Sequence, residues 1–204
     1  HDDIVDDSKL RRGFLALNAL WNNKISVLVG DFLLSKSLLL CIDNDDFDLL
    51  KIISQAVKKM SEGELLQIQK SRNFNITEKE YFDLTRKKTA SLFSACCQLG
   101  AASSGLKNLD TVEEFGLNLG LIFQIKDDLF DYSSRRIGKP TSIDISNQKI
   151  TLPLIYTLNN VNVSDKNFII NSYKNKSKLK KNKNRIYEII DQNGGFKYAI
   201  DKMQ

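Results

Sequence analysis

The sequence predicts an all-α fold, and three observations support this prediction. Only 2 prolines and 10 glycines interrupt the 204 residues, which favours long helices. Apolar residues recur at spacings of three and four along most of the chain, which is the period of a helix. No stretch alternates apolar and polar residues as a half-buried strand does. We therefore expect one helical domain over residues 1–204, long enough to bury a core.

The first two helices are predicted over residues 1–13 and 18–40. Residues 1–13 have two arginines near their end, and Gly13 is placed as a C-terminal stop. The second helix is rich in leucine, but Asp31 and Lys36 interrupt its apolar run. No run is therefore expected to reach the ~20 apolar residues that span a bilayer.

Three further helices are predicted over about 46–71, 77–95 and 111–132. Thr77 and Glu80 have the spacing of a capping box, in which each residue bonds the other's backbone at a helix start. The helix over 111–132 has apolar residues on nearly every side. A helix of that kind belongs in a core, so we expect the chain to be organised around it.

Past this helix, residues 133–149 form a polar segment with glycine and proline, which predicts a loop. A helix is expected to resume over 151–158, a second to follow the connection 159–165, and a further one to begin at 186–190. The basic run 174–185 is expected to be a solvated connection between helices, because no aromatic residues are interleaved in it.

Four polar residues interrupt the apolar helix over 111–132 at spacings that place them along one face: Gln124, Asp127, Asp128 and Asp131. Burying carboxylates in a core is costly unless a cation neutralises them. Mg²⁺ prefers oxygen ligands and is usually held by carboxylates together with substrate phosphates. The alternative is a solvated acidic face, which is at odds with the apolar character of the other sides.

A second acidic cluster, near the start of the chain, repeats the same spacing: Asp2, Asp3 and Asp6. The 1.5 Å rise per residue places Asp2 and Asp6 about 6 Å apart on one helix face. Facing helices of a bundle can direct two such clusters into a shared cavity. We therefore predict that both clusters, six aspartates in all, bind metal.

A set of motifs follows one order over almost the whole chain: DDIVD (2–6) with RRG (11–13), VLVGDFLLS (27–35), SEGELLQIQ (61–69), KT (88–89), FQIKDDLFD (123–131), GK (138–139) and DISNQKITLPL (144–154). Together they resemble the all-trans isoprenyl diphosphate synthases, or polyprenyl synthetases. The likeness is greatest to the bacterial medium- and long-chain, octaprenyl-type members.

The resemblance implies an antiparallel helical bundle of the isoprenoid synthase type around a central cavity, and a homodimer of such bundles. It also implies a prenyltransferase that condenses isopentenyl diphosphate head-to-tail with an allylic diphosphate and makes an all-trans polyprenyl diphosphate. Mg²⁺ is the expected cofactor. The expected location is the cytoplasm, where the product lipid brings the enzyme near the membrane.

The resemblance also implies roles for individual residues. The metal ions that bridge the allylic diphosphate would be held by Asp2, Asp6, Asp127 and, less directly, Asp131. That diphosphate would be contacted by Arg11, Lys88 and Lys139. Isopentenyl diphosphate would be contacted by Arg12. The reacting centre would be lined by Thr89 and Gln124, next to Lys88. The phosphate contacts of a closing loop would include Lys149.

The chemistry is consistent with these roles. Breaking an allylic C–O bond releases pyrophosphate, whose negative charge Mg²⁺ and fixed cationic side chains stabilise. The allylic cation left behind needs a dry, apolar cavity so that water does not capture it. No side-chain nucleophile is required, and the sequence shows no Ser/His/Asp or Cys/His set that would supply one.

The sequence departs from the family at its beginning. Family members carry helices before the first aspartate motif, with a Gly-Gly-Lys-Arg segment that helps bind isopentenyl diphosphate, and this chain starts at His1. We therefore expect a fragment, incomplete at the N-terminus and at the C-terminus. The parent protein is expected to be active, and this chain alone weak or inactive.

Three other functions are compatible with parts of the sequence. A non-catalytic partner subunit of a heteromeric synthase typically loses one aspartate motif, and both are intact here. A terpene cyclase generally replaces the second motif with a mixed Asn/Ser/Glu metal motif, which is absent. A nucleic-acid-binding protein would rest only on the net charge of +5 and the run 174–185. We expect no nucleic-acid partner.

Overall fold

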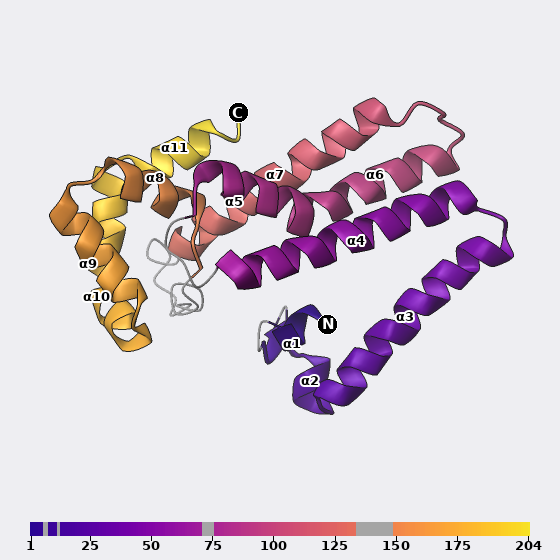
Figure 1. Cartoon of the computed structure of the whole chain (residues 1–204), viewed down its shortest axis with the longest axis horizontal. Coiled ribbons are helices and arrows are strands. Elements are labelled where there is room, and N and C mark those ends of the chain that lie inside the picture. Colours follow the sequence, from indigo (N-terminus) through magenta and orange to yellow (C-terminus); the bar gives the residue numbers. More distant parts are fainter. Residues whose placement is uncertain (6–7, 12, 71–75, 134–148) are drawn as a thin grey trace. The chain divides into compact units, whose positions relative to one another are not determined.

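The computed structural model describes residues 1–5, 8–11, 13–70, 76–133 and 149–204. Nearly all of its regular structure is helical (Figure 1), which confirms the all-α prediction. The chain divides into two units, His1–Ser54 and Gln55–Gln204, and each is described by itself. The prediction of a single domain over the whole chain stays a prediction.

The first unit opens with α1 (Asp2–Val5) and a short hairpin. In the hairpin, β1 (Leu10–Arg11) pairs antiparallel with β2 (Phe14–Leu15). Gly13 lies in its turn with φ of 83°, a left-handed conformation that glycine adopts without steric cost. The predicted helix over 1–13 is therefore wrong beyond Val5, and Gly13 turns a hairpin instead of ending a helix. A strand of two residues is too short to show alternation in the sequence.

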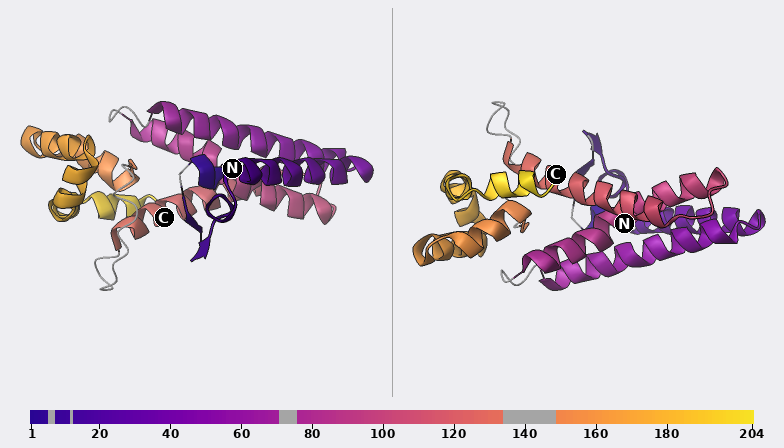
Figure 2. Two further views of the ribbon diagram at one scale, coloured as in Figure 1. Left: turned by 90° about the horizontal axis from the view of Figure 1, so that it is seen from below. Right: turned by 90° about the horizontal axis from the view of Figure 1, so that it is seen from above.

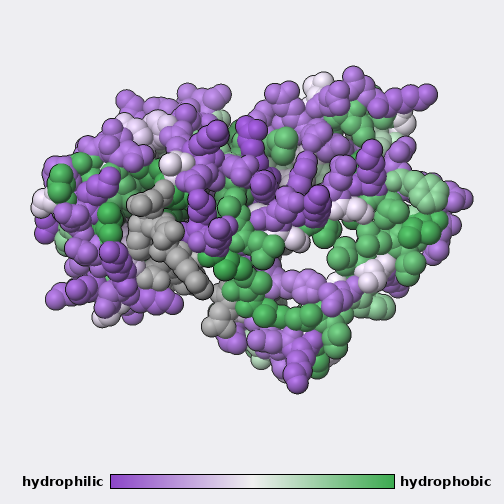
Figure 3. Space-filling model, viewed as in Figure 1, coloured by the Kyte–Doolittle hydropathy of each residue, from purple (hydrophilic) through white to green (hydrophobic). Residues whose placement is uncertain are grey.

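A short α2 (Leu17–Leu20) leads to α3 (Asn23–Asp43), whose first turn is capped by Asn22. The Asn22 side chain accepts a hydrogen bond from the backbone N–H of Ile25 at 2.9 Å. Leucine and phenylalanine side chains remain exposed along α3, and they form the hydrophobic stretch at the right of Figure 3.

By length and composition alone, α3 could cross a membrane, so the expectation that no run is long enough was wrong. This is weak evidence for a membrane span, because the core helix of a soluble protein passes the same test. The charged residues Asp31 and Lys36 lie within the helix.

The next helix, α4 (Phe47–Lys70), begins in the first unit and continues into the second. After it, α5 (Glu78–Thr85), a π-helical turn η1 (Arg86–Ala90) and α6 (Ser91–Ser103) follow one another without a break. The capping box at Thr77 and Glu80 is confirmed, since each side chain bonds the other residue's backbone. No pattern in the sequence predicted the π-helical turn.

The predicted organising helix is α7 (Asp110–Ser133), and it lies beside α6 and η1 (Figures 1 and 2). Two glycines permit the close approach. A Cβ atom on Gly116 would lie 2.5 Å from Cα of Ser94, and one on Gly120 would lie 2.4 Å from Cα of Ala90. Both distances are well below van der Waals contact, so only glycine fits at these two positions.

Burial of α7 differs from the expectation. Its inner face carries Leu121, Ile125, Asp128 and Tyr132, all of them buried. Other apolar side chains of the same helix stay exposed, including Phe115, Phe123 and Phe130. The expectation of a helix buried all round was therefore wrong, because α5, α6 and α8 cover only one side of it.

The remaining helices are α8 (Leu152–Asn160), α9 (Val163–Tyr173), α10 (Lys176–Gln192) and α11 (Gly195–Asp201). The helix predicted over 151–158 is confirmed as α8. The connection predicted over 174–185 is wrong, because α10 begins ten residues before 186. Its Leu179 and Ile186 are fully buried in the core, and the lysines between them point away from it. Most of the loop predicted over 133–149 lies outside the described residues.

Candidate active site

Two residues predicted to line the reacting centre meet where η1 packs on α7. The hydroxyl of Thr89 donates a hydrogen bond to Oε1 of Gln124 at 2.9 Å. Single π-helical turns inside α-helices are frequent at functional sites, because the widened turn redirects the side chains that it carries. The π-helical turn therefore brings a sequence-predicted pair into direct contact.

Lys88 precedes Thr89 in the same turn, and its ammonium forms an ion pair with Oε2 of Glu64 at 2.7 Å. The two side chains are 23% and 20% exposed, so the pair is half-buried and still reaches solvent. Gly63 lets α4 approach, since a Cβ there would lie 2.6 Å from the backbone nitrogen of Lys88. Backbone packing thus holds Lys88 beside a carboxylate that restricts its position.

Asp128 is the most enclosed charged group of the site, with an exposed fraction of 0%. Its Oδ2 accepts hydrogen bonds from the hydroxyl of Tyr81 at 2.7 Å and from the N–H of Leu152 at 3.3 Å. Its Oδ1 accepts one from Nε2 of Gln124 at 3.0 Å and lies 3.0 Å from Nζ of Lys149. A buried carboxylate needs such partners to offset the loss of its hydration.

Tyr81 is itself buried on α5, with 4% of its surface exposed. Burial raises the pKa of the Tyr81 hydroxyl far above its ordinary value, and the negative charge of Asp128 raises it further. The hydroxyl therefore keeps its proton and acts as a fixed donor toward Asp128.

Asp127, the neighbour of Asp128, has the opposite surroundings. Its side chain is 53% exposed, and Oδ2 lies 3.6 Å from Nζ of Lys149. Successive residues of a helix point about 100° apart, so one aspartate faces solvent while the next faces α5 and α8. Lys149 lies between the two carboxylates.

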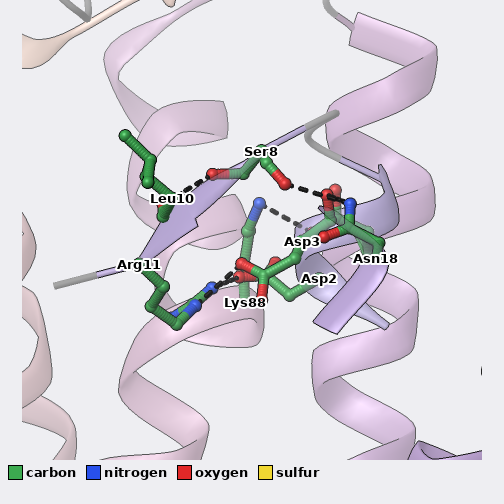
Figure 4. A network of polar contacts seen from close by, with 8 residues as sticks. Asp2, Asp3, Ser8, Leu10, Arg11, Asn18 and Lys88 are labelled. Carbon is green, nitrogen blue, oxygen red and sulfur yellow. Dashed lines mark hydrogen bonds and ion pairs between the residues drawn. The ribbon is translucent and has the colours of Figure 1, made fainter. Parts of the chain in front are cut away.

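The first acidic motif lies in the other unit and is also surrounded by polar contacts (Figure 4). Arg11 donates from Nη2 to Asp2 at 2.8 Å and from Nε to Asp3 at 2.7 Å. The hydrogen bond to Asp3 has the largest effect and the one to Asp2 the next largest, and both raise the pKa of the Arg11 guanidinium. Asn18 holds the segment in place by donating to the backbone oxygens of Asp3 and Ser8. The hairpin therefore brings Arg11 back to the acids that precede it.

Several predicted site residues lie outside the described residues, namely Asp6, Arg12 and Lys139, and so does the side chain of Asp131. Among the side chains that the structure does describe, no three or more potential ligands lie close enough together to hold a metal ion. The assignment of the six aspartates to metal, and of both motifs to one cavity, stays a prediction.

The sequence profile of the polyprenyl synthetase family matches residues 1–190. The chain belongs to this family. The component 2 of heptaprenyl diphosphate synthase from Bacillus subtilis (strain 168) is 35% identical over 176 residues, which are 84% of this chain and 51% of that protein. Octaprenyl diphosphate synthase from Escherichia coli (strain K12) is 36% identical over 162 residues, 78% of this chain and 50% of its own. The chain spans about half the length of the curated relatives it matches.

Solved structures of polyprenyl synthases are similar over the whole chain. A decaprenyl diphosphate synthase from Rhodobacter capsulatus matches with a TM-score of 0.89 and 33% identity, covering 100% of this chain and 64% of that one. A polyprenyl synthase from Caulobacter crescentus CB15, complexed with calcium and isoprenyl diphosphate, matches with a TM-score of 0.85 and 32% identity, covering 100% and 63%. The helices of this chain therefore follow the isoprenyl synthase fold.

Sequence reasoning missed three contributors to this polyprenyl synthetase site: Glu64, Tyr81 and the backbone N–H of Leu152. One signal was available for Tyr81, which lies seven residues before Lys88 and so on the same helix face. Gly116 and Gly120 show a spacing of four, which indicates a close helix contact. No local pattern indicates the N–H of Leu152, because its partner lies 24 residues earlier.

Proposed function

We propose that the protein is a Mg²⁺-dependent prenyltransferase that condenses isopentenyl diphosphate head-to-tail with an allylic diphosphate and makes an all-trans polyprenyl diphosphate. The observation that carries the proposal is the contact between η1 and α7. Thr89 there bonds Gln124, which precedes the solvent-facing Asp127 by three residues, and Lys88 is the neighbour of Thr89. Membership of the polyprenyl synthetase family supports the same reaction.

The carboxylates fit a divalent cation. Asp2 and Asp127 expose 54% and 53% of their side chains, so their oxygens are accessible to a hydrated ion. Mg²⁺ bound to these carboxylates would supply positive charge for the pyrophosphate leaving group. The Caulobacter relative, complexed with calcium and isoprenyl diphosphate, supports a site for a divalent cation together with that ligand.

The side chains of this unit have separate tasks. Lys88 and Lys149 supply positive charge for diphosphate oxygens, and Glu64 restrains Lys88 until the substrate arrives. The prenyl chain requires an apolar surface that excludes water. Leu119 and Phe123 lie eight and four residues before Asp127, and Phe130 lies three after it, so all three share its helix face. All three are exposed, with fractions of 41%, 52% and 59%.

The test is an elongation assay of the full-length protein with farnesyl diphosphate, radiolabelled isopentenyl diphosphate and Mg²⁺. We expect Asp127→Asn to lower kcat/KM at least a hundredfold, about 3 kcal/mol of lost transition-state stabilisation. Asp201→Asn, an exposed aspartate at the end of α11, is the matched control and should leave kcat/KM unchanged. A full-length protein that makes no product, or equal activity in both variants, contradicts the proposal.

The alternative of a partner subunit in a heteromeric synthase has one specific support. The relatives from Bacillus subtilis and Geobacillus stearothermophilus are each named component 2 of a heptaprenyl diphosphate synthase. This alternative predicts no product from the purified protein alone and product after a second subunit is added.

We also propose that the protein works as a homodimer in the cytoplasm. The support for a dimer is the row of exposed apolar side chains on α3, which includes Leu28, Phe32 and Leu40 at 66%, 62% and 65% exposure. Analytical ultracentrifugation tests it, and a monomer at micromolar concentration would contradict it.

A further inference from the structure

Four polar groups surround the carboxylate of Asp128. Tyr81 Oη, Leu152 N, Gln124 Nε2 and Lys149 Nζ all act as donors toward it, two on each oxygen. An ionised carboxylate has about four lone-pair positions, so these four donors account for all of them. Asp128 is also fully buried, while Asp127 beside it is half-exposed and has only Lys149 at 3.6 Å as a described partner.

We propose that Asp128 is a positioning residue that fixes the amide of Gln124 and the first residue of α8, while the metal-binding role stays with Asp127, as the family resemblance implies; this rests on the proposed function. A cation at Asp128 would have to displace hydrogen-bond donors that the fold supplies. The exposed fraction of Asp128 is 0%, so no water could replace those donors. The two adjacent aspartates of the motif therefore have different tasks.

The first group that Asp128 positions is the amide of Gln124. Because a carboxylate only accepts hydrogen bonds, it requires the NH₂ of Gln124 on its side. The amide oxygen is then directed at Thr89, whose hydroxyl donates to it at 2.9 Å. Asp128 thereby sets the orientation of both side chains at the predicted reacting centre.

Asp128 also ties three helices together. Tyr81 comes from α5, Asp128 from α7 and the N–H of Leu152 from the first residue of α8. The partial positive charge of a helix N-terminus adds to the stabilisation of the carboxylate. Lys149 comes just before α8, so the same contact holds its ammonium close to Asp127.

The decisive comparison is Asp128→Asn against Asp127→Asn, with Mn²⁺ and inorganic pyrophosphate as the probe in electron paramagnetic resonance titrations. Asp127→Asn should weaken Mn²⁺ binding at least tenfold, and Asp128→Asn should leave it within twofold of wild type. Turnover should fall about a hundredfold in Asp128→Asn with KM for both diphosphates within threefold. Turnover should fall because the NH₂ of the new asparagine side chain would face hydrogen-bond donors in either orientation of its amide.

Tyr81→Phe provides a second variant with the shape preserved, in case Asp128→Asn does not fold. It should lower kcat about tenfold and speed hydrogen exchange at the Leu152 N–H about tenfold, with Mn²⁺ binding unchanged. Tyr198→Phe is the matched control, because Tyr198 also donates to a carboxylate, that of Glu78, at 2.7 Å. It should change neither kcat nor the exchange at Leu152.

Equal loss of Mn²⁺ binding in the two aspartate variants would overturn the proposal. So would a Tyr81→Phe variant with wild-type kcat and wild-type exchange at Leu152. A full-length wild-type protein that binds Mn²⁺ but makes no product would refute the proposed function instead. In that case the metal titrations and the exchange rates still decide the role of Asp128.

Discussion

Replacing Gly120 by alanine is expected to destabilise the protein, although alanine is the better helix former. In an open helix the change stabilises by about 0.5–1 kcal/mol, since glycine loses more backbone entropy on folding. In α7, the new Cβ would lie 2.4 Å from Cα and 2.8 Å from Cβ of Ala90. The backbone of η1 would have to retreat by about 1 Å to restore ordinary contact. Overpacking of this kind costs about 1–3 kcal/mol, so we expect a net loss of about 1–2 kcal/mol.

The same displacement should lower activity. Thr89 precedes Ala90, and its hydrogen bond to Gln124 is 2.9 Å long. A shift of about 1 Å takes the two oxygens beyond hydrogen-bonding distance. Small displacements of groups at a reacting centre reduce rates by one to two orders of magnitude, so we expect kcat to fall about tenfold.

The assay is urea unfolding followed by far-ultraviolet circular dichroism. Gly100→Ala in α6 is the matched control, because nothing lies within 4 Å of the Cβ it would add. The control should raise the unfolding midpoint and Gly120→Ala should lower it. An equal rise of the midpoint in both variants would show that the packing of α7 on η1 does not require glycine at position 120.

Two further predictions concern stability. The ion pair with Lys70 and the hydrogen bonds at the start of α5 hold the pKa of Glu80 at about 2, below its ordinary 4.5. The folded-state pKa is depressed, so this contribution is present above pH 4.5 and is lost as the pH falls toward about 2. In Glu80→Gln, the melting temperature should therefore fall less steeply between these pH values than in the wild type. An unchanged slope would contradict the lowered pKa of Glu80. Leu179→Ala should lower the free energy of unfolding by about 2–5 kcal/mol, because Leu179 of α10 is fully buried in the hydrophobic core. The adjacent exposed change Lys178→Ala should stay within about 0.5 kcal/mol, and equal effects would show that α10 does not pack as described.

The helical class and several helix bounds are predictable from the order of the amino acids. The capping box at Thr77 and Glu80 and the extent of α7 followed from spacing alone, since the interactions that form them join residues three or four apart. The order of the motifs also sufficed to indicate the family. Local periodicity was less informative for α10, where lysines outnumber the apolar residues that are buried.

The different surroundings of Asp127 and Asp128 depend on how the helices pack. The two residues are identical in type and adjacent, so no spacing rule distinguishes them. Their difference comes from Tyr81, 47 residues before Asp128, and from Leu152, 24 residues after it, which enclose one carboxylate and leave the other in solvent. Contacts of that range depend on how helices pack and not on neighbours along the chain. The physical reason is that hydration, and with it the role of a carboxylate, is set by what covers it.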